Sequence, residues 1–430
     1  MQLQTKQKKF WLTLVIFSLI GQVAWVVENM YLNVFIYNEF GAFPGDIAAM
    51  VAASAVTATL TTVFMGALSD KIGKRKAFMC GGYLLWGISI FGFVLMKKDL
   101  LSAIFTQATS IASLGITLTI GLDCLMTFFG STANDAAFNA WLTDSTTREN
   151  RGMAEGVNAM MPLVSILVVF GGFMFLDTTQ SSAWTVIFSV IGALVLAVGV
   201  LGLFLIKEPP MTPSDTPYLK GIIYGFRPQT VKENKVLYVA LAAFVIFNIS
   251  IQIFMPYLIL YYEVSLQMSN YVLIMAPAII LASVFTFFQG KLYDKKGFGF
   301  SVKAALAALL LGYVLLYFFK GTALVFIGSL LMMTGYLAGM ASFGAVIRDN
   351  TSEGKAGRLQ GVRIFSQVLL PGIIGPYIGK WVLRNAEVVK GADGTESFIP
   401  NANIFLFAAI VAVFVPLLIF AVEKVQKRQR

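Results

Sequence analysis

Three acidic residues lie inside long apolar runs of this sequence: Glu28, Asp123 and Asp135. A charged side chain at the centre of a bilayer costs about 2.5–3.5 kcal/mol on insertion scales, so each acid needs a partner or a function. For Glu28 and Asp123 the sequence favours binding of a substrate or a coupled ion. Asp135 lies near a helix end, where a cap or an interhelical hydrogen bond is the simpler interpretation.

The rest of the composition limits the chemistry open to Glu28 and Asp123. The chain contains no histidine, so a proton-coupled process would have to use these carboxylates. A buried carboxyl group can bind and release a proton near neutral pH. The same oxygens could instead bind Na⁺, because hard cations prefer oxygen ligands. The sequence leaves both H⁺ and Na⁺ open.

Amide and aromatic side chains accompany both acids at helical spacing. On the first predicted helix, four of them share a stripe that has Glu28 at its edge: Gln22, Trp25, Asn29 and Asn33. On the fourth, a stripe about 80° wide contains Asp123, Thr127, Gly130, Asn134, Phe138 and Trp141. Amides bond hydroxyl groups and an aromatic ring covers the apolar face of a sugar, so these stripes predict a surface for a hydroxyl-rich ligand.

The second half of the chain offers fewer polar candidates. Its possible ligand contacts are three amides: Asn248, Gln252 and Gln367. Lone amides in membrane helices more often join helices than bind ligands. Pro371 and Pro376 follow Gln367, however, and prolines can bend a helix into a binding surface.

The overall composition predicts an all-α polytopic membrane protein. Of the 430 residues, 57% are hydrophobic and 13% charged, whereas soluble domains contain about 25% charged residues. Cys80 and Cys124 both lie in apolar stretches, which argues against a disulfide framework or a thiolate metal site. The net charge of +10 sits beside the hydrophobic runs, so it indicates membrane topology and not nucleic-acid binding.

Hydropathy predicts twelve spans. Those of the first half are Phe10–Tyr37, Asp46–Leu68, Ala77–Met96, Ile116–Leu142, Met153–Leu176 and Ala183–Ile206. Those of the second half are Val236–Tyr262, Ser269–Tyr293, Phe300–Phe319, Thr322–Ile347, Leu359–Leu383 and Asn401–Val422. We expect the moderately apolar segment Asp99–Gly115 to be peripheral or re-entrant on the outer face.

Charge and composition predict the topology of these spans. If each Lys and Arg is assigned to its nearest loop, 26 of the 32 fall on the side that holds both termini. We therefore expect cytoplasmic termini, in the plasma or inner membrane of the cell. The predicted division is a six-helix half at 1–206, a proline-rich cytoplasmic linker at 207–235 and a second six-helix half at 236–430.

An internal repeat supports two equivalent halves. GALSDKIG, which begins at Gly66, recurs as GKLYDKKG at Gly290 with an offset of 224 residues. The segment that begins at Asp144 recurs at Asp349 with an offset of 205, so the first half holds 19 more residues between the two motifs. Asp99–Gly115 is about that long and fits an insertion. Two equivalent halves around a midplane cavity form an architecture suited to alternating access.

The run Gly66–Lys76 resembles the signature loop of the major facilitator superfamily, and the resemblance covers essentially the whole chain. A finer resemblance, to the glycoside–pentoside–hexuronide and sucrose-type sugar:cation symporters, rests on the acids of the first and fourth helices and the Asp-containing loop after the fourth. The spacing of the fourth-helix acids differs, so the Na⁺ site of that branch is not carried over.

The superfamily resemblance also implies gating residues. Asp70, in the loop that contains Arg75, would dock on the start of the eleventh helix near Gly361. By symmetry, Asp294 would dock on the start of the fifth near Gly156. These contacts would close the cytoplasmic side and break when the halves rock.

We therefore expect a secondary active transporter: cation-coupled symport of a small polar solute, a sugar or glycoside, by alternating access. The alternative is an exporter (antiporter) of amphipathic compounds or lipids on the same fold. An enzyme is not expected, because the chain has no His cluster, phosphate loop or nucleophile motif. The expected partners are the solute and the lipid bilayer, without nucleic acid; the expected state is a monomer with no metal site and no cofactor beyond co-transported H⁺ or Na⁺.

Overall fold

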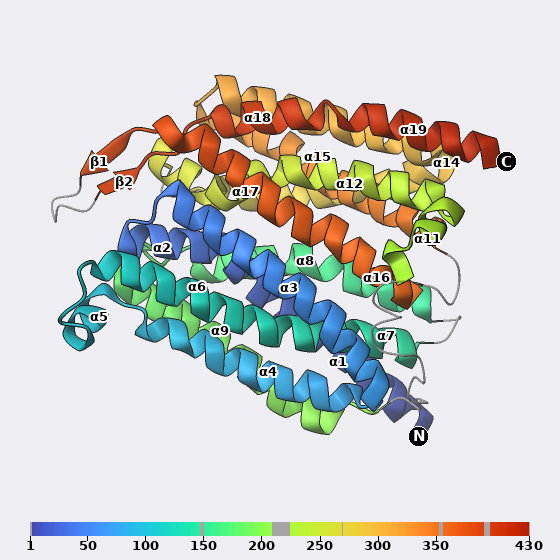
Figure 1. Ribbon diagram of the computed structural model, residues 1–430, viewed down its shortest axis with the longest axis horizontal. Helices are drawn as coiled ribbons and strands as arrows, with labels where there is room; N and C mark the ends of the chain where they lie inside the picture. Colours follow the sequence, from blue (N-terminus) through green and yellow to red (C-terminus); the bar gives the residue numbers. More distant parts are fainter. Residues whose placement is uncertain are drawn as a thin grey trace. The chain divides into compact units, whose positions relative to one another are not determined.

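The computed structural model describes residues 2–146, 150–208, 224–268, 270–351, 356–390 and 396–429. Contacts within the chain divide it into two compact units. The first consists of Met1–Ala42 and Ala53–Ile222, and the second of Phe43–Ala52 and Ile223–Arg430. Both are helical (Figure 1).

The elements before residue 209 are α1 (Gln2–Val26), η1 (Val27–Tyr31), α2 (Leu32–Phe40), α3 (Pro44–Ile72), α4 (Arg75–Gly92), η2 (Phe93–Leu95), α5 (Lys98–Ile104), α6 (Ile111–Gly130), η3 (Ser131–Phe138), α7 (Asn139–Ser145), α8 (Arg151–Phe173) and α9 (Ser181–Leu205). Of these, η1 and η3 are π-helical turns that continue a span, and η2 is a 3₁₀ turn.

The elements after residue 223 are η4 (Tyr224–Phe226), α11 (Pro228–Glu233), α12 (Lys235–Phe254), η5 (Met255–Tyr257), α13 (Leu258–Leu260), η6 (Tyr261–Ser265), α14 (Val272–Phe318), α15 (Thr322–Asp349), α16 (Ala356–Ile364), η7 (Phe365–Leu369), α17 (Leu370–Val382), η8 (Leu383–Asn385), β1 (Val388–Lys390), β2 (Glu396–Phe398), α18 (Asn403–Ala412) and α19 (Val415–Gln429). The two strands form a small antiparallel hairpin.

The twelve predicted spans are confirmed. Eleven helical stretches of the described residues are long and apolar enough to cross a membrane. The longest, α14, is two spans, because Gly297 interrupts it with φ 78° and ψ 176°. Glycine adopts this left-handed backbone without the steric cost that a Cβ imposes. The two arms of α14, residues 272–296 and 298–318, correspond to the predicted eighth and ninth spans.

The segment Asp99–Gly115 is not an additional span. It contains α5, whose seven residues are too few to cross a bilayer. The backbone N–H of Lys98 at its start donates to Glu39 Oε1 at 2.8 Å. The fourth span begins at Ile111 and not at the predicted residue 116, because Ser110 caps the helix by accepting from the N–H of Ser113.

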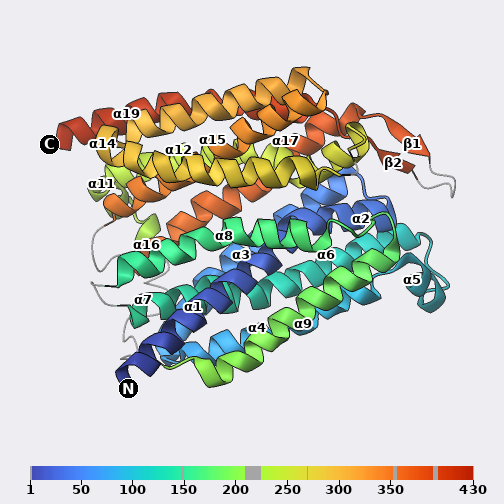
Figure 2. The ribbon, with the colours of Figure 1, turned by 180° about the vertical axis from the view of Figure 1, so that it is seen from behind.

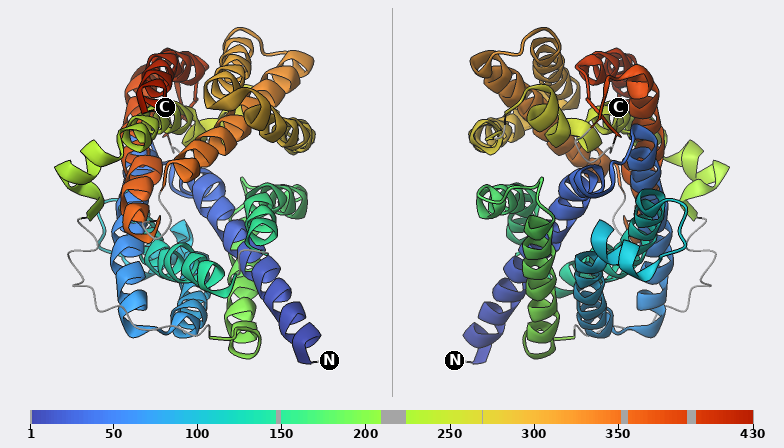
Figure 3. Two further views of the ribbon diagram at one scale, coloured as in Figure 1. Left: turned by 90° about the vertical axis from the view of Figure 1, so that its right-hand side faces the viewer. Right: turned by 90° about the vertical axis from the view of Figure 1, so that its left-hand side faces the viewer.

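Close helix contacts inside each unit occur at glycines. A Cβ on Gly87 of α4 would lie 2.8 Å from the Leu196 nitrogen of α9, and Figure 2 shows these helices side by side. In the second unit, a Cβ on Gly335 of α15 would lie 2.4 Å from the Leu309 nitrogen in the second arm of α14. Small residues let membrane helices approach closely, and the end-on views of Figure 3 show the helices of each unit gathered into a bundle.

The predicted linker, 207–235, is described only in part. Residues 209–223 lie outside the described residues. The rest is partly helical, because η4 and α11 fall within residues 224–233. Pro228 occupies the first turn of α11, where its missing N–H removes no helical hydrogen bond.

Candidate functional site

Glu28 lies on η1, the π-helical turn that separates α1 from α2. Such turns are rare and often occur at functional sites, because the extra residue changes where side chains point. The Glu28 side chain is 7% exposed within the protein. The first span therefore holds this acid inside its own bundle and not toward lipid.

Two hydroxyl groups from other helices bond one oxygen of Glu28. Ser54 of α3 donates to Glu28 Oε1 at 2.5 Å, and Thr127 of α6 donates to the same oxygen at 2.9 Å. The two hydroxyl oxygens are 3.0 Å apart. This carboxylate–hydroxyl cluster joins three spans of the first unit. Thr127 was a predicted site residue, but the sequence analysis missed Ser54, whose only signal is a hydroxyl in a run of small residues.

Asp123 lies one helical turn before Thr127, so its side chain is on the same face of α6. It is 1% exposed. Within the described part of the chain, Asp123 Oδ1 and Glu28 Oε2 are both buried without a hydrogen-bond partner. Buried polar atoms are rarely left unpaired, so these two oxygens are available to a proton or a cation.

A small cavity borders Glu28. Its volume is about 10 Å³, enough for about one water molecule. The remaining lining is apolar: Ala24, Val27, Leu32, Ile90, Phe93, Met126, Phe188 and Ile191. This space is too small for a sugar.

The predicted amide stripe of the first helix is largely bonded to its own backbone. Asn29 Nδ2 donates to the Trp25 carbonyl at 2.7 Å, and Asn33 Nδ2 donates to the Asn29 carbonyl at 2.9 Å. Asn33 is fully buried, and its Oδ1 has no partner among the described residues. Gln22 is half-buried on the same helix.

Trp25 packs against an aromatic neighbour in the first unit. Its ring lies 4.9 Å from that of Trp86. Asn134, predicted to face a ligand, accepts a hydrogen bond from the Tyr83 hydroxyl at 3.2 Å and is 3% exposed. Asp135 accepts from Ser131 of its own helix at 2.9 Å. The predicted cap or interhelical bond stays a prediction.

The three amides of the second unit are spread over two spans. Asn248 Nδ2 donates to the Phe244 carbonyl one turn back, at 2.9 Å. A Cβ on Gly375 of α17 would lie 2.4 Å from Gln252 Cβ, so this amide lies at a tight contact between α12 and α17. Gln367 lies on the π-helical turn η7, half-buried, before Pro371.

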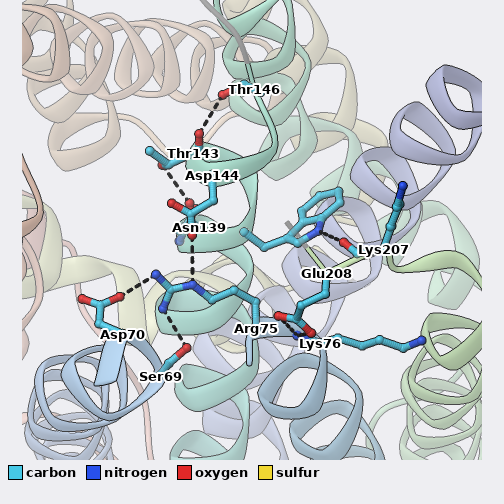
Figure 4. A network of polar contacts seen from close by, with 11 residues as sticks. Ser69, Asp70, Arg75, Lys76, Asn139, Thr143, Asp144, Thr146, Lys207 and Glu208 are labelled. Carbon is cyan, nitrogen blue, oxygen red and sulfur yellow. Dashed lines mark hydrogen bonds and ion pairs between the residues drawn. The ribbon is translucent and has the colours of Figure 1, made fainter. Parts of the chain in front are cut away.

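Arg75 is the centre of a second polar cluster in the first unit (Figure 4). The residue is 4% exposed. Its guanidinium contacts Asp70 at 2.5 Å, Asp144 at 3.0 Å and the Ser69 hydroxyl at 2.8 Å. Asp144 ends the fourth span and Ser69 ends the second, so one arginine fastens both to the start of α4. The sequence analysis named Arg75 and Asp70 here but not their partners.

The end of α9 lies beside the same helix start. The backbone N–H of Lys76 donates to the Glu208 carboxylate at 3.2 Å (Figure 4). Lys76 Nζ donates to the Leu203 carbonyl at 2.7 Å. Glu208 thus caps the positive end of the α4 dipole.

The docking of Asp70 near Gly361 and of Asp294 near Gly156 joins residues of different units and stays a prediction. Asp294 is exposed in the second unit. Its neighbour Tyr293 donates to Asp349 Oδ2 at 2.6 Å. The sequence analysis identified Asp349 as a repeat of Asp144 but did not predict its tyrosine partner.

Comparison with known families identifies the architecture. Residues 11–376 match the family model described as Major Facilitator Superfamily. The chain belongs to that superfamily. It is therefore an integral membrane transporter of small molecules and not an enzyme.

Solved structures of other major facilitator proteins share the fold. The nucleoside transporter NupG is 14% identical with a TM-score of 0.68. The match covers 96% of this chain and 99% of NupG. The xylose transporter XylE from E. coli, in a partially occluded inward-open conformation, is 13% identical with a TM-score of 0.69. The match covers 95% of this chain and 97% of XylE. A bacterial homologue of the human lysosomal transporter Spinster is 14% identical with a TM-score of 0.67. The match covers 97% of this chain and 97% of that protein. No curated protein matches the sequence significantly.

For a major facilitator transporter, the two clusters of the first unit suit different tasks. Glu28 and Asp123 each have one buried carboxylate oxygen without a partner in the described chain, which suits reversible binding of a proton or a cation. The Arg75 cluster has its donors matched by acceptors, which is the chemistry of a structural fastening.

Proposed function

We propose that this major facilitator protein is a cation-coupled symporter of a small polar solute, a sugar or glycoside, and that Glu28 carries the coupling. The observation that supports it is the buried Glu28 carboxylate, bonded at Oε1 by Ser54 and Thr127 and unpartnered at Oε2. Binding a cation there would neutralise a charge that is costly within a membrane.

The membrane potential supplies enough energy for one coupled cation to drive solute uptake. One positive charge that crosses 100 mV supplies about 2.3 kcal/mol, which corresponds to about fiftyfold accumulation of solute. A single binding event at Glu28 could therefore drive uptake. Asp123 would share the work, because its unpaired oxygen lies on the same face of α6 as Thr127.

A polar solute is supported by amides that stay at least partly exposed, Gln22 and Asn29 on the first span and Gln367 on the eleventh. Two proteins that share this fold are a nucleoside transporter and a xylose transporter, so the architecture accommodates hydroxyl-bearing solutes. The coupled ion, H⁺ or Na⁺, is distinguished by experiment.

One observation favours the second candidate, an exporter of amphipathic compounds. Asn29 and Asn33 bond the backbone of their own helix, which leaves fewer donors for solute hydroxyls. The exporter predicts outward movement of amphipathic compounds or lipids in exchange for ions that enter down their gradient, and no accumulation of sugars.

Uptake into proteoliposomes tests the proposal. Vesicles with an inside-negative potential would receive a panel of labelled sugars under an inward H⁺ gradient, an inward Na⁺ gradient or neither. We expect one solute to accumulate with one ion only, and Glu28→Gln to reduce accumulation from about fiftyfold to about equal concentrations. Glu233→Gln, at an exposed carboxylate bonded to Gln229, is the matched control.

A second measurement separates coupling from folding. If the ion is H⁺, a glutamine imitates the protonated carboxyl, so Glu28→Gln should still exchange labelled for unlabelled solute at equal concentrations. Full accumulation by Glu28→Gln would overturn the role of Glu28. No movement of any sugar under either gradient would overturn the sugar assignment and lead to the exporter assay.

A further inference from the structure

The first arm of α14 presents an exposed apolar stripe in the second unit. Its members repeat at helical spacing within about 120° and are 42–68% exposed: Leu273, Ile280, Leu281, Val284, Phe287 and Phe288. This exposed stripe is large and apolar, and it belongs to an integral membrane protein. Lipid chains are therefore the surroundings that this stripe fits.

Two lysines end the stripe on the same face. Lys291 follows Phe287 by four residues, and Lys295 follows Lys291 by four, so all three point to one side of the helix. Eighteen residues separate Leu273 from Lys291, or about 27 Å of helix at 1.5 Å per residue. That nearly matches the roughly 30 Å hydrocarbon core, so Lys291 lies where hydrocarbon gives way to headgroups.

The contacts of Lys291 keep its charge at that boundary. Its Nζ lies 5.2 Å from the centre of the Phe287 ring and 5.6 Å from that of Phe288. Lys296 immediately precedes the turn at Gly297, and its Nζ lies 4.3 Å from the ring of Phe300, where the next span begins. An ammonium over an aromatic face retains N–H donors, so it can bond a phosphate at the same time.

We propose that Lys291 and Lys295, together with the rings of Phe287 and Phe288, form a binding site for the headgroup of an anionic phospholipid. Lipid chains would lie along the apolar stripe and the phosphate would meet the two ammonium groups. Lys296 adds a third positive charge and the exposed Asp294 subtracts one, which leaves a local charge of +2. The proposal does not depend on the solute or on the coupled ion.

The first repeat loop keeps only part of this arrangement: Lys71, the equivalent of Lys295, is exposed and follows the exposed Phe64 by seven residues. The equivalent of Lys291 there, at the offset of 224 residues, is Ala67. Arg75 is buried among protein acceptors, and Lys76 Nζ donates to the Leu203 carbonyl. A general need for positive charge near a membrane surface is met by both loops. In the second loop, Lys291 lies over two exposed rings at the end of the apolar stripe, and a second lysine follows on the same face.

Fluorescence quenching tests the site. Phe288→Trp places an indole beside Lys291, and the same vesicles with the unsubstituted protein give the background from the six native tryptophans. Brominated phosphatidylglycerol, titrated into phosphatidylcholine, reports local enrichment of the anionic lipid; brominated phosphatidylcholine is the neutral reference. We expect the anionic lipid to be favoured about fivefold for each of the two lysines, and 0.5 M NaCl to reduce that preference.

Charge removal decides the outcome. Lys291→Gln with Lys295→Gln, in the Phe288→Trp protein, should lower the preference to about one. Lys320→Gln, an exposed lysine at the far end of the second arm of α14, should leave it unchanged. The proposal is overturned if Phe288→Trp shows equal quenching by both lipids, or if the preference survives the double substitution. If the double variant does not fold, Lys291→Gln alone must lower the preference about fivefold.

Discussion

In the first repeat loop, Gly66–Lys76, a buried arginine holds the acids together, whereas in the second, Gly290–Phe300, a tyrosine bonds the matching acid directly. Gly299 stands at the position of Arg75 and Tyr293 at that of Ser69. Tyr293 donates to Asp349, the equivalent of Asp144, at 2.6 Å. Two copies of one motif thus fasten the same helix ends by an ionic contact in one unit and by a single hydrogen bond in the other.

The surroundings of Gly299 show why the second loop lacks an arginine. A Cβ at Gly299 would lie 1.6 Å from Glu423 Oε1, so the carboxylate of α19 occupies the space that any side chain would need. Glu423 in turn bonds Lys303 at 3.0 Å. The same motif can therefore keep its glycine and aspartate positions while its ion pairs change, because the ion pairs are set by neighbours outside the motif.

Arg75→Ala should have the largest effect on stability. It removes contacts to two carboxylates and one hydroxyl from a buried position, and we expect a loss of about 2–3 kcal/mol in the free energy of unfolding. The loss stays below that of a fully buried pair, because Asp70 and Asp144 are 53% and 28% exposed and can rehydrate. Denaturant unfolding in detergent measures it.

Arg75→Lys serves as the companion variant. It keeps the charge but not the planar fork, so about half of the loss should return. A value for Arg75→Ala within about 0.5 kcal/mol of the natural protein would show that the first loop depends on its ion pairs no more than the second.

Tyr293→Phe should come next, at about 1 kcal/mol, because one hydrogen bond to a carboxylate is lost at a half-buried place. Tyr317→Phe, on the same helix and also half-buried, is the matched control and should change stability by much less. Equal effects of the two substitutions would contradict a fastening role for the Tyr293 hydroxyl. The same unfolding assay applies.

Gly299→Ala should have an effect that depends on Glu423. In the natural protein, the new Cβ must displace the Glu423 carboxylate from Lys303. In a Glu423→Gln background that ion pair is already absent. We expect Gly299→Ala to lower the free energy of unfolding by about 0.5 kcal/mol more in the natural protein than in the Glu423→Gln background. That difference is the size of an exposed ion pair. A double-mutant cycle measures this difference, and additive effects would contradict it.

Asp70→Asn should have the smallest effect on stability, a few tenths of a kcal/mol at low salt and none in 0.5 M NaCl, because the Asp70 side chain is 53% exposed and its ion pair is screened. Transport offers a separate test. If Asp70 also docks near Gly361 during the cycle, the uptake rate should fall several-fold while stability hardly changes. Unchanged uptake would count against that docking.

The spans and the repeat could be predicted from the sequence because both are recorded along the chain itself. Length and hydropathy predicted twelve spans, and the structure shows the one ambiguous segment, at Asp99–Gly115, to be a short helix. Helix ends were less accurate: the fourth span begins at Ile111, since the Ser110 cap is a single polar atom that a hydropathy window averages away.

The carboxylates could also be located from sequence, since an acid in an apolar run is costly wherever the chain folds. Their partners could not. Ser54 is 26 residues from Glu28 and Thr127 is 99 residues away, so only the packing of three helices brings their hydroxyls to one oxygen. For the amide stripe, spacing placed Asn29 and Asn33 on one face, and only the structure shows that their amide donors bond their own backbone.

The sequence by itself determined the membrane class, the twelve spans, the duplicated halves and the residues that carry charge inside the membrane, because hydropathy and period are properties of neighbouring residues. Only the tertiary structure decided which charges are matched. It gave Arg75 two acids and a hydroxyl, gave Asp349 a tyrosine, and left one oxygen each of Glu28 and Asp123 without a partner in the described chain. Hydrogen bonds act over about 3 Å, and that proximity exists only after the helices have packed.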